Sequence, residues 1–201
     1  MGGAVALAAW LQSVWNWGST DTEQETTLPG DELVPEPAMI TTRAVSIDAS
    51  ANEVWRWLVQ IGQDRGGMYS YDWLENLVGL HIHSAEQIRE KWQTLAVGDR
   101  IRLVPVGWLG MKEGLALPVE RIDPPRYLVL REAPSETPWD AIWSFHTLPD
   151  DASHCRLVSR TRATRQSGLS RVAALPMDLV ALAMTRRMLL GIKQRAERQP
   201  R

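Results

Sequence analysis

The hydrophobic and polar positions of this chain change their period near residue 97. Before that point, apolar residues recur at helical spacing behind Ser50 and Glu53, a pair that matches a capping box. Gly62 is the predicted stop of this helix, whose apolar stripe consists of Val54, Trp55, Leu58, Val59 and Ile61. A second helix is predicted over residues 71–78, and a second capping-box match at residues 84–87 predicts a short third helix.

Beyond residue 97 the period is two, which is typical of strands with one buried face. The alternating segments cover residues 100–104, 115–122, 127–132, 139–148 and 155–165, and a further strand is predicted over residues 41–48. Short gaps with Gly, Pro or Asp separate the later segments, so they predict an antiparallel meander. Within one of them, Trp143 and Phe145 fall on one face and Ser144 and His146 on the other, with Ile142 as an interruption.

A long helix is predicted at the end of the chain, over residues 170–198. Pro176 is expected to bend or restart this helix. At 1.5 Å per residue it would span roughly 40 Å, enough to cross a sheet. Met184 and Met188 would give it an adaptable surface if they face a cavity. The order of strand, helices, meander and long helix predicts an α+β fold class.

Composition fits one main domain, since the chain has 201 residues, of which 44% are hydrophobic and 23% charged. We predict this domain over residues 38–201, after an apolar helix and extended arm in residues 1–37. The apolar part of residues 4–17 is shorter than the ~20 residues that span a bilayer, and no Lys or Arg precedes it as in a secretory signal. Trp10, Trp15 and Trp17 are expected to pack on the domain. The alternative is a weak peripheral contact with a membrane in an otherwise cytoplasmic protein.

Charge and cysteine content exclude some partners. A net charge of −2 and a pI of about 6.1 do not favour nucleic acid. Basic residues gather late in the chain, most densely over residues 186–201, where a solvated helix face is the expected role. Cys155 is the only cysteine in the sequence, so no intrachain disulfide forms, and we expect a small core residue there rather than a nucleophile.

The stretch over residues 66–77 predicts the wall of a cavity. It places two glycines beside the rings of Tyr69, Tyr71 and Trp73. Tyr and Trp offer broad apolar faces with a polar tip, which suits a site that holds a greasy ligand and orients it. The sequence therefore indicates a pocket without naming its ligand.

Five local motifs carry a family resemblance. They are WGST at residues 17–20, LPGDEL at 28–33, TTRA at 41–44, EVWRWLVQIG at 53–62 and GMYSYDWLENL at 67–77. With the order of elements, they resemble a largely uncharacterised bacterial branch of the START, polyketide-cyclase and birch-pollen-allergen superfamily, often called SRPBCC, from about Trp15 to about Arg195. The resemblance implies a helix-grip fold, in which a curved antiparallel sheet wraps around the long C-terminal helix and the ligand lies between them. It does not imply one function, because the fold hosts carriers, receptors and enzymes.

The first functional hypothesis is binding of a small hydrophobic or amphipathic molecule, including a lipid. Apolar burial would supply most of the affinity, at roughly 25 cal/mol per Å² before the costs of ordering. A further hypothesis is a membrane-peripheral or protein-interaction module that uses the N-terminal Trp residues. The predicted ligand-binding residues are Tyr69, Tyr71, Trp108, Trp139, Trp143, Leu179 and Met184.

The alternative hypothesis is a cyclase- or dehydratase-like enzyme that acts by general acid–base catalysis. Its candidate residues are Tyr71 and Asp72, with His146 if its side chain turns inward. A Tyr held near a buried carboxylate can donate a proton to an enolate or orient a carbonyl, and Glu75 is another carboxylate in the same stretch.

Metal and cofactor chemistry find little support in the sequence. His81 and His83 have the HxH spacing of a possible ligand pair, yet no third ligand follows at a telling interval. No phosphate loop, dinucleotide fingerprint or nucleophile elbow is present. We therefore expect neither a metal site nor a cofactor.

Overall fold

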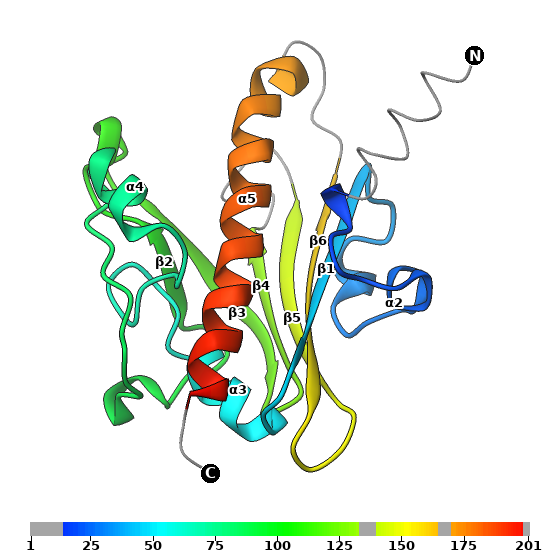
Figure 1. Cartoon of the computed structure of the whole chain (residues 1–201). Helices are drawn as coiled ribbons and strands as arrows, with labels where there is room; N and C mark the ends of the chain where they lie inside the picture. The colour runs from blue at the N-terminus through cyan, green and yellow to red at the C-terminus, as the bar shows by residue number, and fades with distance from the viewer. Residues whose placement is uncertain (1–13, 133–139, 165–169, 199–201) are drawn as a thin grey trace.

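The computed structural model contains a curved, six-stranded antiparallel sheet (Figure 1). It describes residues 14–132, 140–164 and 170–198, and gives only the backbone of 170–179. The strands are β1 (Met39–Ile47), β2 (Arg100–Val104), β3 (Leu115–Asp123), β4 (Tyr127–Glu132), β5 (Ala141–Pro149) and β6 (Cys155–Ala163). Their order across the sheet is β1-β6-β5-β4-β3-β2. The predicted meander is confirmed, and β1 joins it by pairing with β6.

One long helix, α5 (Ser170–Glu197), crosses the concave face of this sheet, and α3 (Ala51–Leu58) lies near its C-terminal end (Figure 1). The fold class is therefore α+β with a helix-grip arrangement, as expected. Ser50 and Glu53 form the predicted capping box, since each backbone amide binds the other side chain at 3.3 and 2.9 Å. Two details differ from the prediction. The helix α3 ends at Leu58 before reaching Gly62, and α5 continues through Pro176 as one helix.

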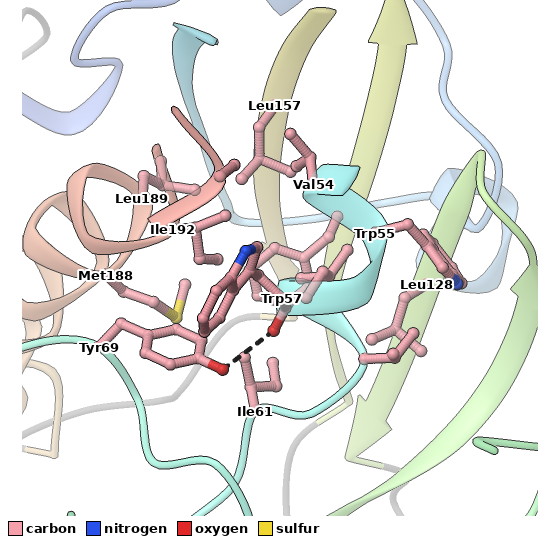
Figure 2. Packing of buried hydrophobic residues seen from close by; sticks show 14 of the residues in the cluster. Val54, Trp55, Trp57, Ile61, Tyr69, Leu128, Leu157, Met188, Leu189 and Ile192 are labelled. Atoms are coloured by element: carbon pink, nitrogen blue, oxygen red, sulfur yellow. Dashed lines mark hydrogen bonds between the residues drawn. The ribbon is translucent and has the colours of Figure 1, made fainter. Parts of the chain in front are cut away.

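The main core lies between the concave face of the sheet and the two helices (Figure 2). The ring of Tyr69 meets Trp57 of α3 edge to face, with centroids 5.9 Å apart. Met188 and Ile192 of α5 pack beside this pair. These contacts fix α5 across the sheet, because each of the buried side chains belongs to the same apolar cluster.

The convex face of the sheet is covered by an arm over residues 18–37, which contains α2 (Asp21–Glu25) and the 3₁₀ helix η1 (Asp31–Leu33) (Figure 1). Asp31 forms an almost wholly buried ion pair with Arg160 of β6 at 2.6 Å. Val34 packs on Ile142 of β5. The arm makes the convex face a second buried surface. This explains why the apolar Ile142 interrupts the alternation of apolar and polar residues along β5. The predicted arm is thus an integral layer of the fold.

The helix predicted over residues 84–87 does not form, which corrects the second capping-box match. The Ser84 hydroxyl donates to Asp72 at 2.6 Å and accepts the backbone amide of Tyr69 at 2.9 Å. The Ser84 hydroxyl therefore binds residues more than ten positions away instead of capping a helix that begins at Ser84. The short helices of this region are α4 (Asp72–Leu77) and the 3₁₀ helices η2 (Glu90–Trp92) and η3 (Trp108–Gly110).

Candidate functional site

A surface groove runs beside α5, with a volume of about 520 Å³. We call it the α5 groove. One wall consists of Ser70, Tyr71 and Trp73, and the α5 wall consists of Arg186, Arg187 and Leu190. The side chain of Trp73 is 70% exposed, which is unusual for so large an apolar surface. The groove thus combines aromatic, aliphatic and cationic groups within reach of one small molecule.

The first wall is positioned by a strained loop before α4. Gly67 has a φ of +76°, and a Cβ there would lie 2.6 Å from Ser84 Cα, so only glycine fits. Tyr69 has a φ of +55°, in the left-handed region that a bulky residue rarely adopts. The Tyr69 hydroxyl accepts a hydrogen bond from Gln60 Nε2 at 2.8 Å and donates one to the Trp57 carbonyl at 3.2 Å. These two bonds hold the side chain in place. The surrounding core therefore maintains a backbone turn that presents the next residues to the groove.

Asp72 helps to hold this loop through both of its carboxylate oxygens. Its carboxylate accepts the Ser84 amide and the Ser84 hydroxyl, both at 2.6 Å. A carboxylate bound this way fixes the start of α4 against the 83–85 segment. The structure gives Asp72 a positioning role, and its part in acid–base catalysis stays a prediction.

Glu75 is the buried carboxylate of the site. Its side chain lies in α4, accepts a hydrogen bond from the Ser70 hydroxyl, and leaves Oε2 shielded from solvent without a hydrogen-bond partner. Burial raises the pKa of Glu75, against the opposing effect of the Ser70 hydrogen bond. Ser70 lines the α5 groove. The Ser70 hydroxyl therefore links the buried carboxylate of Glu75 to the groove wall.

The α5 wall carries two guanidinium groups that lie over aromatic rings. Arg187 lies over Tyr71 at 5.9 Å, and Arg186 lies over Trp17 at 4.8 Å, measured to the ring centroids. A cation–π contact of this kind holds a guanidinium beside the ring without using up its N–H donors, which can still bind an anion. Part of the basic cluster that the sequence assigned to a solvated face thus belongs to the groove.

The predicted ligand-binding residues are not gathered in one place. Tyr71 lines the α5 groove, whereas Tyr69 is a buried core residue beside it. Trp108 lies near α4, where its indole nitrogen donates to the Val78 carbonyl at 2.7 Å. Trp143 lies on the concave face of the sheet, and Met184 is half-buried on α5. Trp139 and the side chain of Leu179 fall outside the described residues.

His146 does not turn inward, which corrects its candidacy as an acid–base group at the α5 side. It lies on the convex face under the arm, 3.0 Å from the Ser144 hydroxyl. Burial, together with the charge of Arg160, lowers the pKa of His146 to about 4. The strand alternation predicts this side, because His146 shares its face with Ser144 and not with Phe145.

Cys155 lies in the core, and the His81–His83 pair lies at the surface. Cys155 is buried, and its burial raises the pKa of the thiol to about 11. His81 and His83 are both exposed. Within the described ranges, no three His, Cys, Asp or Glu side chains gather closely enough to hold a metal ion.

Trp17, from the N-terminal Trp cluster, lies against the domain. Trp17 packs on the main core and under Arg186 of α5, while Trp10 lies outside the described residues. In the part of the chain that the structure covers, no helix has the length and apolar character needed to cross a membrane.

Residues that sequence reasoning missed include Ser70, Arg186, Arg187 and Leu190. The sequence places Trp73 in the aromatic stretch but gives no reason to count it among the binding residues. The pairing of Arg187 with Tyr71 joins residues over a hundred positions apart, so periodicity alone cannot reveal it. The dense run of basic residues on the final helix was the available signal.

Comparison with known proteins supports the fold. A hypothetical protein, jhp0584, from Helicobacter pylori is 12% identical, with a TM-score of 0.50 over 89% of this chain and 99% of that one. Zhui aromatase/cyclase from Streptomyces sp. R1128 is 17% identical, with a TM-score of 0.48 over 81% and 96% of the two chains. No family model and no curated protein matches this chain. At these identities the likeness concerns the fold, and function is argued from the site.

Proposed function

We propose that this protein binds a small amphipathic molecule beside α5. The observation that carries the proposal is the α5 groove, where Tyr71 and Trp73 face two arginines and Leu190. The rings and Leu190 suit the apolar body of a ligand, and the guanidinium of Arg187, which lies over Tyr71, suits a polar or anionic end. A lipid or another hydrophobic metabolite with a polar group has this chemistry.

The helix-grip arrangement and the five local motifs also support membership in the bacterial branch of the SRPBCC superfamily. In that setting the long helix is the element against which a ligand packs. The proposal for this chain rests on its own groove residues, since relatives of this fold carry out unrelated functions.

Titration with 1-anilinonaphthalene-8-sulfonate tests the proposal, because this anionic aromatic probe fluoresces when it enters an apolar site. We expect saturable binding to the wild type and an affinity at least tenfold weaker in Trp73→Ala. Leu109→Ala is the matched control, since Leu109 is also a highly exposed apolar residue but does not line the groove. Equal losses in the two variants, or no saturable binding to the wild type, would contradict the proposal.

A second candidate function is acid–base catalysis at the same groove, favoured by the Ser70–Glu75 pair. A carboxyl group with a raised pKa retains a proton closer to neutral pH, as a general acid requires. For a relay, the protonated Glu75 would donate to the Ser70 oxygen while the Ser70 hydroxyl hydrogen passes to a bound carbonyl in the groove, which reverses the hydrogen bond that Ser70 donates to Glu75 in the structure.

Turnover assays with polyketide-like and ester substrates separate the two functions. An enzyme that depends on this pair should lose roughly 10²-fold or more of its kcat in Glu75→Gln, while affinity for the fluorescent probe is retained. A binding protein would show no turnover in the wild type or in the variant.

A further inference from the structure

The outer surface of α4 is apolar, which is the reverse of an ordinary surface helix. Trp73 and Leu77 lie one turn apart on this surface, and the two residues are 70% and 76% exposed. Leu74 and Val78 beside them are exposed as well. Single exposed apolar side chains are common, whereas a contiguous group of them marks an interaction surface.

The polar side chains of α4 are all bound or buried within the protein. Asp72 accepts hydrogen bonds from Ser84, and the Asn76 side chain exchanges two hydrogen bonds with the backbone of Ile82 at 2.7 and 2.8 Å. Glu75 is buried. A solvated helix turns such groups toward water and its apolar residues toward the core. The helix α4 does the opposite, so its outer face fits a partner that is more apolar than water.

A second exposed apolar segment adjoins α4 at the turn between β2 and β3. The indole nitrogen of Trp108 donates to the Val78 carbonyl at 2.7 Å, which ties η3 to the C-terminal end of α4 (Figure 1). Leu109 of η3 is 82% exposed, and Val106 is exposed on the same turn. Leu109 also has a φ of +46°, in the left-handed region that is unfavourable for leucine. Backbone strain and high exposure thus coincide at one apolar residue, as they do at functional sites.

The turn that carries Leu109 projects from the domain. A Cβ added at Gly107 or Gly110 would meet no atom within 4 Å outside its chain neighbours. The sequence over residues 103–111 contains no charged residue. We call this turn and the outer surface of α4 the apolar tips. A projecting, uncharged turn enters a soft apolar phase readily, whereas a folded protein partner would need a matching cavity to receive it.

Cations border the apolar tips. Arg186 and Arg187 of α5 line the α5 groove together with Trp73, and Lys112 is exposed directly after the turn. Glu113 follows Lys112, but neither α4 nor the η3 turn presents an exposed carboxylate of its own. Apolar side chains bordered by cations match the surface of a bilayer that contains anionic lipid, because the apolar groups enter the interface and the cations bind phosphates.

We propose that the apolar tips dock on a membrane surface that contains anionic phospholipid. Trp73, Leu77 and Leu109 would enter the interface, while Lys112 and the bordering arginines would bind the phosphates of the lipid head groups. This surface differs from the N-terminal Trp residues, of which Trp17 lies against the domain. It also goes beyond ligand binding in the α5 groove, since docking requires no bound ligand.

Co-sedimentation of the full chain with lipid vesicles tests this proposal. One set of vesicles is phosphatidylcholine alone, and in the other about one-third of the lipid is phosphatidylglycerol. We expect the wild type to bind the anionic vesicles roughly tenfold or more tightly, and added salt to weaken this binding. The double variant Leu77→Asp/Leu109→Asp should bind the anionic vesicles at least tenfold more weakly than the wild type, because a carboxylate does not enter the interface.

The double variant is expected to fold. Both positions are highly exposed, and aspartate adopts the left-handed backbone of position 109 more readily than leucine. Val97→Asp is the matched control, because Val97 is 65% exposed but precedes β2, whereas the η3 turn follows the other end of that strand. It should bind vesicles as the wild type does. Equal losses in the double variant and in Val97→Asp would overturn the proposal.

A fluorophore on the η3 turn gives a second readout. Cys155 is buried, so an environment-sensitive thiol label attaches selectively in Leu109→Cys. With anionic vesicles its emission should shift to the blue and be quenched by lipids with brominated acyl chains. The same label in Val97→Cys should respond to neither. Equal responses at the two positions, or none at position 109, would contradict insertion of the tip.

Three further results would assign the surface elsewhere and overturn the proposal. The first is a wild type that sediments with neither set of vesicles. The second is vesicle binding that Trp10→Ala abolishes and the double variant retains, since the N-terminal segment would then be the anchor. The third is a concentration-dependent dimer that the double variant abolishes in the absence of vesicle binding. The fluorescent-probe titration decides the groove proposal separately, because Leu77 and Leu109 do not line the α5 groove.

Discussion

His146 shows how burial determines the protonation state of a single residue. The imidazole lies under the arm, close to Ser144 and within the field of Arg160. Burial favours its neutral form, so its pKa in the folded protein falls from 6.5 to about 4. In the unfolded chain the same side chain accepts a proton near its ordinary pKa. Folding and protonation of His146 therefore oppose each other between these two values.

Stability should consequently fall as the pH drops from about 6.5 to about 4. Above pH 6.5, His146 is neutral in both the folded and the unfolded state, so its protonation costs no stability. As the pH approaches the folded pKa of about 4, protonation of the unfolded chain lowers the free energy of unfolding by on the order of 3 kcal/mol. Urea unfolding at pH 7 and pH 4.5 checks this. The decrease in the free energy of unfolding from pH 7 to pH 4.5 should be smaller in His146→Gln than in the wild type. His83 is exposed, so the control variant His83→Gln should lose as much stability between pH 7 and pH 4.5 as the wild type. Equal decreases in His146→Gln and His83→Gln would contradict this role of His146.

Tyr69 and Tyr71 illustrate the limit of sequence reasoning for single residues. Both lie in the same aromatic stretch, and the sequence predicts both as ligand contacts. The left-handed backbone at Tyr69 and its bonds to Gln60 and Trp57 place that ring in the core, whereas Tyr71 reaches the groove. Neither the backbone conformation nor a partner nine residues away can be read from a local pattern.

At the scale of elements, α5 is set against the loop before α4 by a close backbone contact. Gly191 of α5 meets the Tyr69 residue so tightly that an added Cβ would overlap the Tyr69 carbonyl oxygen and lie 2.8 Å from Tyr69 Cβ. This contact places one wall of the α5 groove against the other. The glycine is required here by space, since its helical backbone would otherwise favour alanine.

Gly191→Ala should therefore destabilise the protein, although the same change in an exposed helix is usually favourable. We expect a loss of about 1–3 kcal/mol in the free energy of unfolding, because the loop or the helix must shift. Chemical denaturation measures it, with the exposed position Gln194→Ala as a nearly neutral control. A Gly191→Ala variant as stable as the wild type would show that the two walls are not packed as described.

The two predicted capping boxes had opposite outcomes for a physical reason. Ser50 precedes a run of apolar residues at helical spacing, so its helix gains tertiary packing along with the cap. Ser84 precedes no comparable stripe, and its hydroxyl binds Asp72 and Tyr69 instead. A short capping motif predicts a helix only where an amphipathic face follows it.

For the whole molecule, alternation predicted the sheet and helical spacing predicted the long helix that crosses it. The second covering layer was harder to predict, because the arm over residues 18–37 has the composition of a linker. Its contacts with the sheet depend on Arg160 and Ile142, which are distant in sequence. The five local motifs implied the helix-grip arrangement, while the α5 groove required knowledge of which residues meet across the fold.

Native mass spectrometry tests whether a ligand binds beside α5. The full chain would be incubated with an organic-solvent extract of its expression host and compared under native and denaturing conditions. We predict a small non-protein mass that is released on unfolding, with at least tenfold lower occupancy in Trp73→Ala and full occupancy in Leu109→Ala. A wild type that carries no such mass, or one whose occupancy is the same in Trp73→Ala, would contradict the account.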